Sequence, residues 1–471
     1  MLPRPHGNRI GWTATADAAL STLASLVERA PGRALVSVTA PVVIGDPSAA
    51  VFAARMAGDR WFCWEEPAEG FALATLGSVD EVVARRTARF PDTAAACAAF
   101  VRDRIADEPD KLPAGAGPVW VGGFAFAPDG GRAPQWSSFP PALMTMPELA
   151  LHRLQDETLM TLCAVAGPGS TAALKRLRAR LAALGDGELP LLDPHPSETA
   201  EIASAFPPGD YERAVAAAVE EIRAGERQKL VLAREVRVTA PAAHEPAAIF
   251  GAMRTAFPSC FCFCCGSPEA AFLGASPELL VRRRGASAAT VALAGSTRRS
   301  ADPAVDDHLG EMLLRSAKDR AEHDFVARRI ERTLRPHAVW VEAAPEPGLV
   351  KVANIQHLAT PVHAQLAEPR PVLELAGLLH PTPAVGGEPP EGSPEAIGRL
   401  EDLDRGWYAG PVGWMDAAED GEFCVALRSA LIRDRIAHLF AGAGIVADSD
   451  PAAELAETEL KLGALLPLLA G

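Results

Sequence analysis

The pattern of hydrophobic and polar positions changes near residue 200. Before it, Ala-rich segments alternate with short apolar runs, among which residues 159–165 predict a strand and residues 170–184 predict a basic amphipathic helix. A Pro-rich polar stretch at residues 189–199 predicts a linker or long loop. The pattern therefore divides the chain into an N-terminal part, residues 1–195, and a C-terminal region, residues 200–471.

Beyond residue 200 the periodic signals are stronger. A helix is predicted between Asp210, as its N-cap, and Gly225, as its stop. Residues 229–238 predict a strand, and residues 306–334 predict one long helix. Further strands are predicted at residues 260–265, 271–274, 279–283, 291–294, 350–358, 410–415, 423–433 and 438–443. Strands at hairpin-like spacing with helices inserted between them indicate an α+β fold with a largely antiparallel sheet.

The last predicted helix carries two carboxylates on one face. Pro451 suits its first position, with Asp450 as the N-cap. Glu454 and Glu457 are three residues apart on this helix, and Lys461 lies one turn further on. Two carboxylates on one face repel each other unless a cation or a partner lies between them. We therefore expect this helix to supply half of a site.

A second carboxylate pair, Asp319 and Glu322, lies three residues apart on the predicted long helix. Either pair alone is typical of a solvated helix face. Two helices that each offer a pair, however, can hold a hard divalent cation between them. Because the ligands are carboxylate oxygens, the sequence indicates Mg²⁺.

Lys229 and Glu278 are the candidate base and acid. Lys229 opens a predicted strand of mostly apolar residues, where it either extends to the surface or is desolvated enough to act as a base. Glu278 follows a Ser-Pro turn between two predicted strands, where burial can keep a carboxyl protonated as an acid. A turn carboxylate without such a role is the alternative interpretation.

Three further residues are candidates for binding an anionic group. Arg428 interrupts a strand pattern, and the spacing allows either an inward orientation, which suits a carboxylate, or an outward one. Gly442 and Gly444 form a GxG that no helix follows directly. This pattern favours open backbone N–H groups for a carboxylate over a phosphate-binding loop.

The charge and hydrophobicity of the chain limit the molecules that it can be expected to bind. The chain has 45 Lys and Arg against 60 Asp and Glu, a net charge of -15, which argues against nucleic acid. An anionic substrate would need local cations or a metal ion. The N-terminus has no apolar h-region, and no apolar run reaches the length of a membrane span. We therefore expect a cytoplasmic protein without a membrane segment.

Four of the eight cysteines lie within residues 260–265. They could form a metal cluster or belong to a buried strand, in which Cys serves as a small apolar residue. Their alternation with Phe261 and Phe263 suits a strand, and no second Cys cluster has metal-ligand spacing. The buried strand is the favoured interpretation.

Taken together, the motifs resemble those of the chorismate-utilising enzymes, and within them the isochorismate synthases. They occur in order as KLVLAR (229–234), GASPELL (274–280), LAGSTRR (293–299), KDRAEHDFV (318–326), QHLATP (356–361), LHPTPAVGG (379–387), DRGWYAGPVG (404–413), VALRSAL (425–431) and AGAGIVADSDP (441–451). The resemblance implies a mixed α/β fold with a large antiparallel β-sandwich core, surrounding helices and a site between the sheets. Residues 1–195 would pack on the chorismate-binding catalytic region, residues 200–471.

The resemblance also implies a role for each candidate residue. Mg²⁺ would bind the ring carboxylate of chorismate, the substrate. The residues implied for the metal are Glu322 and Glu457, in direct contact, and Asp319 and Glu454, through waters. The residues implied for the substrate are Gly295, Ser296, His357, Tyr408, Arg428, Gly442, Gly444 and Lys461. Lys229 would activate water for attack at ring C2, and Glu278 would protonate the departing C4 hydroxyl.

The expected reaction is therefore the Mg²⁺-dependent isomerisation of chorismate to isochorismate. Relatives that add ammonia carry a non-basic residue in place of Lys229, which disfavours anthranilate synthase and implies no glutamine amidotransferase subunit. Aminodeoxychorismate synthases carry a lysine nucleophile where this chain has Ala294. Salicylate synthases, which also eliminate pyruvate, share the lysine and the glutamate and are the alternative. The resemblance further implies a monomer or weak dimer and a product used for menaquinone or siderophore biosynthesis.

Overall fold

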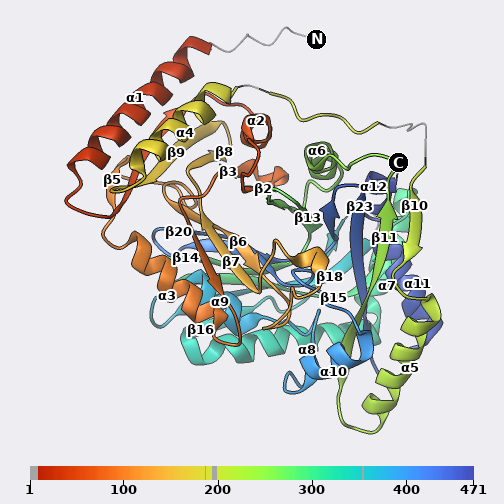
Figure 1. Ribbon diagram of the computed structural model, residues 1–471. Coiled ribbons are helices and arrows are strands. Elements are labelled where there is room, and N and C mark those ends of the chain that lie inside the picture. Colours follow the sequence, from red (N-terminus) through yellow and green to blue (C-terminus); the bar gives the residue numbers. More distant parts are fainter. Residues whose placement is uncertain (1–8, 186, 194–198, 353–354, 471) are drawn as a thin grey trace.

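Two large β-sheets form the centre of the fold, and helices cover their outer faces and one end (Figure 1). The computed structural model describes residues 9–185, 187–193, 199–352 and 355–470. The first eight residues and part of the predicted linker, residues 194–198, lie outside the described residues. Within them, every strand pairing is antiparallel except that of β1 with β5. The expected mixed α/β fold with a large antiparallel core is confirmed.

The two sheets combine strands from both halves of the sequence. The first sheet runs in the order β10 (Glu201–Ser204), β11 (Lys229–Thr239), β23 (Ile436–Ile445), β22 (Ser429–Arg433), β13 (Ala271–Ser276), β12 (Phe261–Gly266), β2 (Trp61–Glu66), β3 (Phe71–Leu76), β8 (Leu149–Leu154), β9 (Glu157–Val165), β1 (Leu35–Val42) and β5 (Ile105–Asp107), with β19 (Gly387–Glu388) on β11. The second runs β16 (Ala338–Ala343), β18 (Ile355–Leu366), β15 (Ser287–Arg298), β14 (Leu279–Arg284), β21 (Gly421–Val425), β20 (Pro411–Asp416), β6 (Val119–Phe124), β7 (Ala142–Met146) and β4 (Asp80–Ala84), with β17 (Gly348–Lys351) on β18. Because β2 pairs with β12 and β6 with β20, the N-terminal part extends both sheets.

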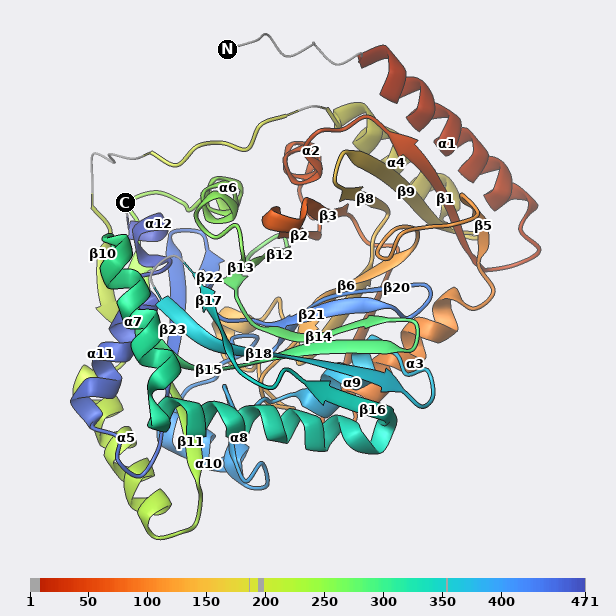
Figure 2. The same ribbon diagram turned by 180° about the vertical axis from the view of Figure 1, so that it is seen from behind.

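The helices divide between two buried clusters. The cluster on the outer face of the first sheet includes side chains of α1 (Arg9–Arg29), α2 (Pro47–Ala54), α4 (Ser170–Ala183), α6 (Pro246–Ala256) and α12 (Leu466–Ala470). The cluster that both sheets share includes side chains of α3 (Arg89–Val101), α5 (Pro208–Arg223), α8 (Ala317–Leu334), α9 (Val372–Leu379) and α10 (Ser393–Glu401). Two more helices, α7 (Pro303–Arg315) and α11 (Pro451–Leu462), contact β15 and β23 respectively. Figure 2 shows α8 lying along β15 and β18.

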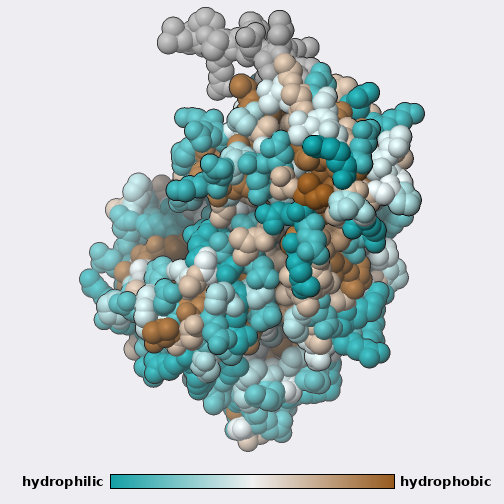
Figure 3. Space-filling model, turned by 90° about the vertical axis from the view of Figure 1, so that its left-hand side faces the viewer, coloured by the Kyte–Doolittle hydropathy of each residue, from teal (hydrophilic) through white to brown (hydrophobic). Residues whose placement is uncertain are grey.

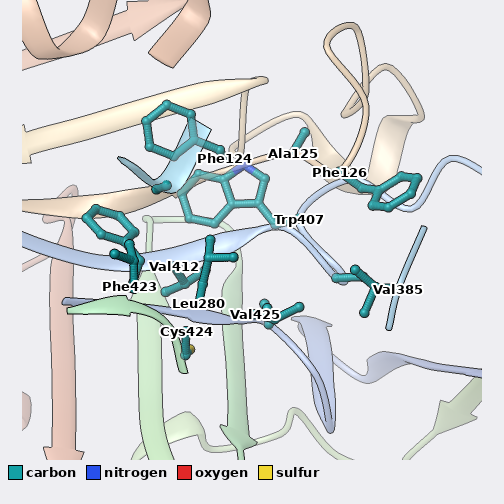
Figure 4. Close-up of a cluster of buried hydrophobic side chains, with 14 of the residues drawn as sticks. Phe124, Ala125, Phe126, Leu280, Val385, Trp407, Val412, Phe423, Cys424 and Val425 are labelled. Atoms are coloured by element: carbon teal, nitrogen blue, oxygen red, sulfur yellow. The ribbon is translucent and has the colours of Figure 1, made fainter. Parts of the chain in front are cut away.

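Trp407 is at the centre of the shared core. Its indole ring lies among Phe124 of β6, Val412 of β20 and Phe423 of β21 (Figure 4). It is 1% exposed, and its N–H donates a hydrogen bond to Pro140 O at 2.8 Å. An indole buried with its donor satisfied is a rigid anchor. It fixes the segment that carries the neighbouring Tyr408.

Glu278 and Arg428 lie where the chain changes sheet. The chain passes from β13 to β14 through Glu278, and from β21 to β22 through Arg428. The two crossings are bonded together, since Ala275 N donates to Arg428 O at 3.1 Å and Val425 N donates to Glu278 O at 3.0 Å. Arg428 has a φ of 45°, a left-handed backbone that these bonds maintain. The corner of the sandwich therefore holds both side chains on rigid backbone.

Four sequence predictions about elements were wrong. The predicted strand 350–358 covers parts of two strands, β17 and β18, which pair with each other as antiparallel neighbours. The predicted helix 306–334 is two helices, α7 and α8, because Ser316 ends the first and caps the second by accepting a bond from Asp319 N. Helix α5 begins at Pro208, so Asp210 lies in its first turn and is not the cap. The predicted strand 423–433 is two strands in different sheets, because the chain turns at Arg428. In contrast, the Pro451 start and the Asp450 cap of α11 are confirmed.

The cysteine-rich segment is a strand of the core. Residues 261–265 belong to β12, between β13 and β2, and Cys260 immediately precedes this strand. All four cysteines are buried and unbonded to one another. Burial raises the pKa of Cys260 and of Cys264 to about 12, so both thiols stay protonated. The buried-strand interpretation is confirmed.

The surface is mostly polar. The face in Figure 3 is largely hydrophilic, with apolar side chains scattered over it. Among the described helices, none has both the length and the apolar character needed to cross a bilayer.

Candidate active site

A cavity of about 180 Å³ is lined by residues of both sheets and of helices α8 and α11. It gathers most of the residues singled out in the sequence, namely Lys229, Glu278, Gly295, Ser296, Asp319, Glu322, His357, Arg428, Gly444, Glu454, Glu457 and Lys461. The other two, Tyr408 and Gly442, line a smaller cavity of about 50 Å³. Arg428 and Lys461 line both cavities, so the two form adjoining compartments of one site.

Two lysines in the cavity are paired with the two carboxylates implied as direct metal ligands. Lys229 is only 6% exposed, so it is buried at the start of β11 and does not extend to the surface. Its Nζ donates to Glu322 Oε1 at 2.7 Å. Lys461 Nζ lies 2.7 Å from Glu457 Oε1 and donates to Gly442 O at 2.8 Å. Each lysine thus neutralises one carboxylate from a neighbouring turn or helix.

The carboxylates of α11 have different environments. Burial raises the pKa of Glu454, and the nearby charge of Glu457 adds to this effect, although Ser449 Oγ donates to Glu454 Oε1 at 2.7 Å. Burial acts in the same direction on Glu457, but Lys461, together with Arg428 and Lys229, outweighs it and the pKa of Glu457 is lowered. Glu457 is therefore the firmly ionised member of the pair.

The carboxylates that line the cavity are the possible ligands for Mg²⁺. As arranged, the described residues contain no group of three or more His, Cys, Asp or Glu side chains placed to share one ion. The four carboxylates nevertheless line one cavity, and all offer the oxygen donors that Mg²⁺ prefers. The lining also carries four cationic side chains, Lys229, Lys318, Arg428 and Lys461, which roughly balance its carboxylates. A bound dianion would make the net charge of the cavity negative, and Mg²⁺ would offset that charge. Glu322 and Glu457 fit this ion once they release Lys229 and Lys461.

Glu278 has the properties of a general acid. Its carboxyl is 2% exposed and accepts a hydrogen bond from Thr382 Oγ1 at 3.1 Å. Burial raises the pKa of Glu278 to about 7, against the opposing effects of Thr382, Arg428 and Lys229. A carboxyl that keeps its proton close to neutral pH is suited to donate it to a leaving group.

Arg428 points into the site, the inward orientation of the two that the sequence allowed. Since a guanidinium is always protonated, Arg428 Nη2 donates to His357 Nε2 at 2.9 Å. His357 therefore carries its proton on Nδ1, which donates to Gly295 O at 3.3 Å. Burial, together with Arg428 and Lys461, lowers the pKa of His357 well below its usual value, so the ring is neutral. The Nε of Arg428 has no partner among the described residues, which leaves it for a ligand.

The glycines of β23 shape the site from the first sheet. Their partners on β11 direct their N–H groups away from β23, since Val231 N donates to Gly386 O and Ala233 N to Glu401 Oε1. Such pairs are not bonded to each other, so Gly442 and Gly444 turn their backbone groups outward as well. A Cβ at Gly444 would lie 3.0 Å from Lys229 Cε. The absence of a side chain there makes room for the pair of Lys229 and Glu322.

Several lining residues were not singled out in the sequence. Thr382 belongs to the LHPTPAVGG motif and bonds to the acid, while Ser449 bonds to Glu454. Lys318 opens the KDRAEHDFV motif and lines the cavity beside Asp319. Their presence inside the quoted motifs was an available signal, but hydroxyls and an exposed lysine carry no distinctive spacing.

The chain matches the family model described as chorismate binding enzyme over residues 20–470. It is 40% identical over 359 residues to the salicylate biosynthesis isochorismate synthase of Pseudomonas aeruginosa. The aligned region covers 74% of this chain and 73% of that protein. The chain is 33% identical over 429 residues to the isochorismate synthase MenF of Bacillus subtilis, covering 89% of each.

Solved structures of other proteins share the fold of this chain. The structure of MenF, the menaquinone-specific isochorismate synthase from Escherichia coli, superposes with a TM-score of 0.80 at 26% identity and covers 97% of this chain and 100% of that one. Anthranilate synthase component I from Streptococcus pneumoniae has a TM-score of 0.66 over 84% of this chain and 92% of that one. At 18% identity, the second likeness concerns the fold alone.

Proposed function

We propose, starting from the fact that this chain belongs to the chorismate-binding enzymes, that it converts chorismate to isochorismate. The observation that carries this proposal is one cavity that combines a buried amine, Lys229, with a buried carboxyl, Glu278, whose pKa lies at about 7. An acid and a base of this kind are what a hydroxyl exchange needs. The names of relatives over 30% identical, both isochorismate synthases, support the same reaction.

Lys229 is assigned the role of base. Its Nζ accepts a proton from water as the water oxygen forms a bond to ring C2. In the described arrangement Nζ donates to Glu322. Lys229 can therefore act as the base only after Glu322 takes another partner and the ammonium loses one proton to solvent, which leaves a neutral amine. The exchange of partners by Glu322 thus couples substrate binding to the start of the reaction.

Glu278 completes the exchange as the acid. As the double bonds of the ring shift, the C4–O bond breaks and Glu278 donates its proton, so the C4 hydroxyl leaves as water. One water is consumed and one is released, and the product is an isomer of the substrate. Because the nucleophile is water, the proposed reaction requires no amidotransferase subunit.

The cationic groups are assigned to the substrate carboxylates. Arg428, with one nitrogen unpaired among the described residues, and Lys461 would bind the enolpyruvyl carboxylate beside Tyr408. His357, neutral and fixed by Arg428 and Gly295, would contact the ring. Mg²⁺, when held by Glu322 and Glu457 with Asp319 and Glu454 close by, would supply positive charge for the ring carboxylate.

Product analysis tests the proposal. Purified protein is incubated with chorismate and Mg²⁺, and the mixture is separated by chromatography while pyruvate is measured with lactate dehydrogenase. The proposal predicts isochorismate without pyruvate. Salicylate with an equal amount of pyruvate would instead identify a salicylate synthase, and unchanged chorismate would refute both.

Removal of the metal is expected to abolish turnover. Glu322→Gln and Glu457→Gln should each weaken Mg²⁺ binding by at least about tenfold, because each replaces a charged ligand with a neutral one. Calorimetric titration of Mg²⁺ into protein with chorismate measures this directly, and EDTA in the activity assay provides the comparison. As a control, Glu459→Gln removes an exposed carboxylate of α11 that pairs with Arg234 outside the cavity. Full activity in EDTA would contradict the assignment.

Two glycine substitutions are expected to separate activity from stability. Gly444→Ala places a methyl group 3.0 Å from Lys229 Cε and 3.4 Å from Glu322 Oε1, so it should lower kcat by about 10- to 100-fold with little loss of stability. Gly442→Ala places the methyl group 2.9 Å from the backbone oxygen of Leu232, so it should mainly lower the melting temperature. Steady-state kinetics and thermal unfolding measure the two effects. Equal kcat for Gly444→Ala and the unmodified protein would argue against Lys229 as a catalytic group.

A further inference from the structure

The proposed substrate poses an electrostatic problem for this chain. Chorismate carries two carboxylates, whereas the protein has a net charge of -15. A field of this sign repels the substrate over the distance of a Debye length and lowers its local concentration. A cation accessible from solvent at the mouth of the site would offset the repulsion.

Three of the four cations that line the cavity are already engaged. Lys229 is buried against Glu322, and Lys461 is bonded to Glu457 and to a backbone oxygen. Arg428 is buried and donates to His357. These groups can bind a carboxylate that has entered, but their burial limits what they contribute outside.

Lys318 is the remaining cation, and it differs from the other three in its exposure and in its pairing. It is exposed in the first turn of α8, yet it lines the cavity together with Asp319. Among the described residues no carboxylate lies within ion-pairing distance of its ammonium group.

We propose that Lys318 is an additional substrate-binding residue, which attracts the carboxylates of chorismate to the mouth of the cavity. The inference rests on the proposed function, because it takes the dicarboxylate substrate from it. Lys318 has no part in the bond changes, so its loss should weaken binding and leave the chemical step intact. The attraction should also be screened by salt, because the ammonium group is exposed.

Charge substitutions at this position test the inference. Lys318→Glu should weaken chorismate binding and lower kcat/KM by about tenfold at low ionic strength, Lys318→Met by less, and both should leave kcat within about twofold. Added salt should lower kcat/KM less in both variants than in the unmodified protein, and it should raise kcat/KM for Lys318→Glu, because screening then removes a repulsion. Arg320→Met is the matched control, since Arg320 is a cation two residues away that pairs with Glu346 and does not line the cavity.

Calorimetric titration of chorismate separates this inference from the proposed function, because binding requires no turnover. If the unmodified protein binds chorismate without forming isochorismate, the proposed function fails and the comparison of Lys318 variants still stands. If Lys318→Glu binds chorismate as tightly as the unmodified protein, with the same salt dependence, the inference is overturned whatever the product. Absence of chorismate binding by the unmodified protein overturns both. Thermal unfolding checks that the exposed substitutions leave the fold intact.

Discussion

Replacement of Lys229 by methionine is expected to lower the rate of isochorismate formation by about 10³-fold. General base catalysis contributes roughly 10²- to 10⁴-fold, and the loss of the amine also removes the partner of Glu322. The measurement is chromatographic quantification of isochorismate under saturating chorismate and Mg²⁺. Isomerisation at a rate near that of the unmodified protein would refute Lys229 as the base.

Lys229→Arg separates the two functions of this residue. An arginine keeps the positive charge next to Glu322 but does not release a proton at accessible pH, so it preserves the ion pair and removes the base. If the amine acts as the base, Lys229→Arg should be nearly as inactive as Lys229→Met while unfolding at a temperature close to that of the unmodified protein. Substantial activity in the arginine variant would show that only the ion pair matters.

Glu278→Gln is expected to lower kcat by about 10²- to 10⁴-fold, because the amide has no acidic proton to donate. The pH dependence gives a second readout. The acid must be protonated, and burial raises the pKa of Glu278 to about 7, so kcat of the unmodified protein should fall as pH rises through about 7. The residual rate of Glu278→Gln should lack this limb. Glu66→Gln is a matched control, because burial raises the pKa of Glu66 to about 7 as well, yet Glu66 lies outside the cavity.

Stability should respond to Glu278 in the same pH range. The folded protein keeps this proton up to about pH 7, whereas the unfolded chain loses it near the ordinary value of 4.5. The folded state therefore binds more protons between these values, and its stability falls as pH rises from about 4.5 through about 7. Glu278→Gln should remove this part of the pH dependence, which thermal unfolding at several pH values measures. An unchanged pH dependence in both rate and stability would contradict the assigned acid.

Local spacing was enough to predict the acidic faces of the site. Carboxylates three residues apart lie on one face of any helix, so Asp319 with Glu322 and Glu454 with Glu457 could be paired before the fold was known. The start of α11 was also predictable, because Pro and Asp have positional preferences at helix N-termini. The motif resemblance then indicated that the two helices meet.

Features that depend on tertiary contacts were not predictable in this way. Arg428 interrupts the apolar pattern of residues 423–433, but this interruption by itself does not indicate a change of sheet, because the pattern continues on both sides. The break at Ser316 has no glycine or proline to mark it, and its one local signal is the serine that caps α8 by accepting a bond from Asp319 N. The pairing of Lys229 with Glu322 joins residues 93 positions apart, and sequence spacing has no information on such a contact.

The source of the new oxygen tests the central claim most directly. The reaction is run briefly in water enriched in oxygen-18. The product is then identified, and its molecular mass is measured, by liquid chromatography with mass spectrometry. Attack of water at C2 predicts isochorismate that carries one heavy oxygen on the ring and none in its carboxylates. Isochorismate without the label would contradict the proposed attack by water, because the hydroxyl would then have moved within the molecule.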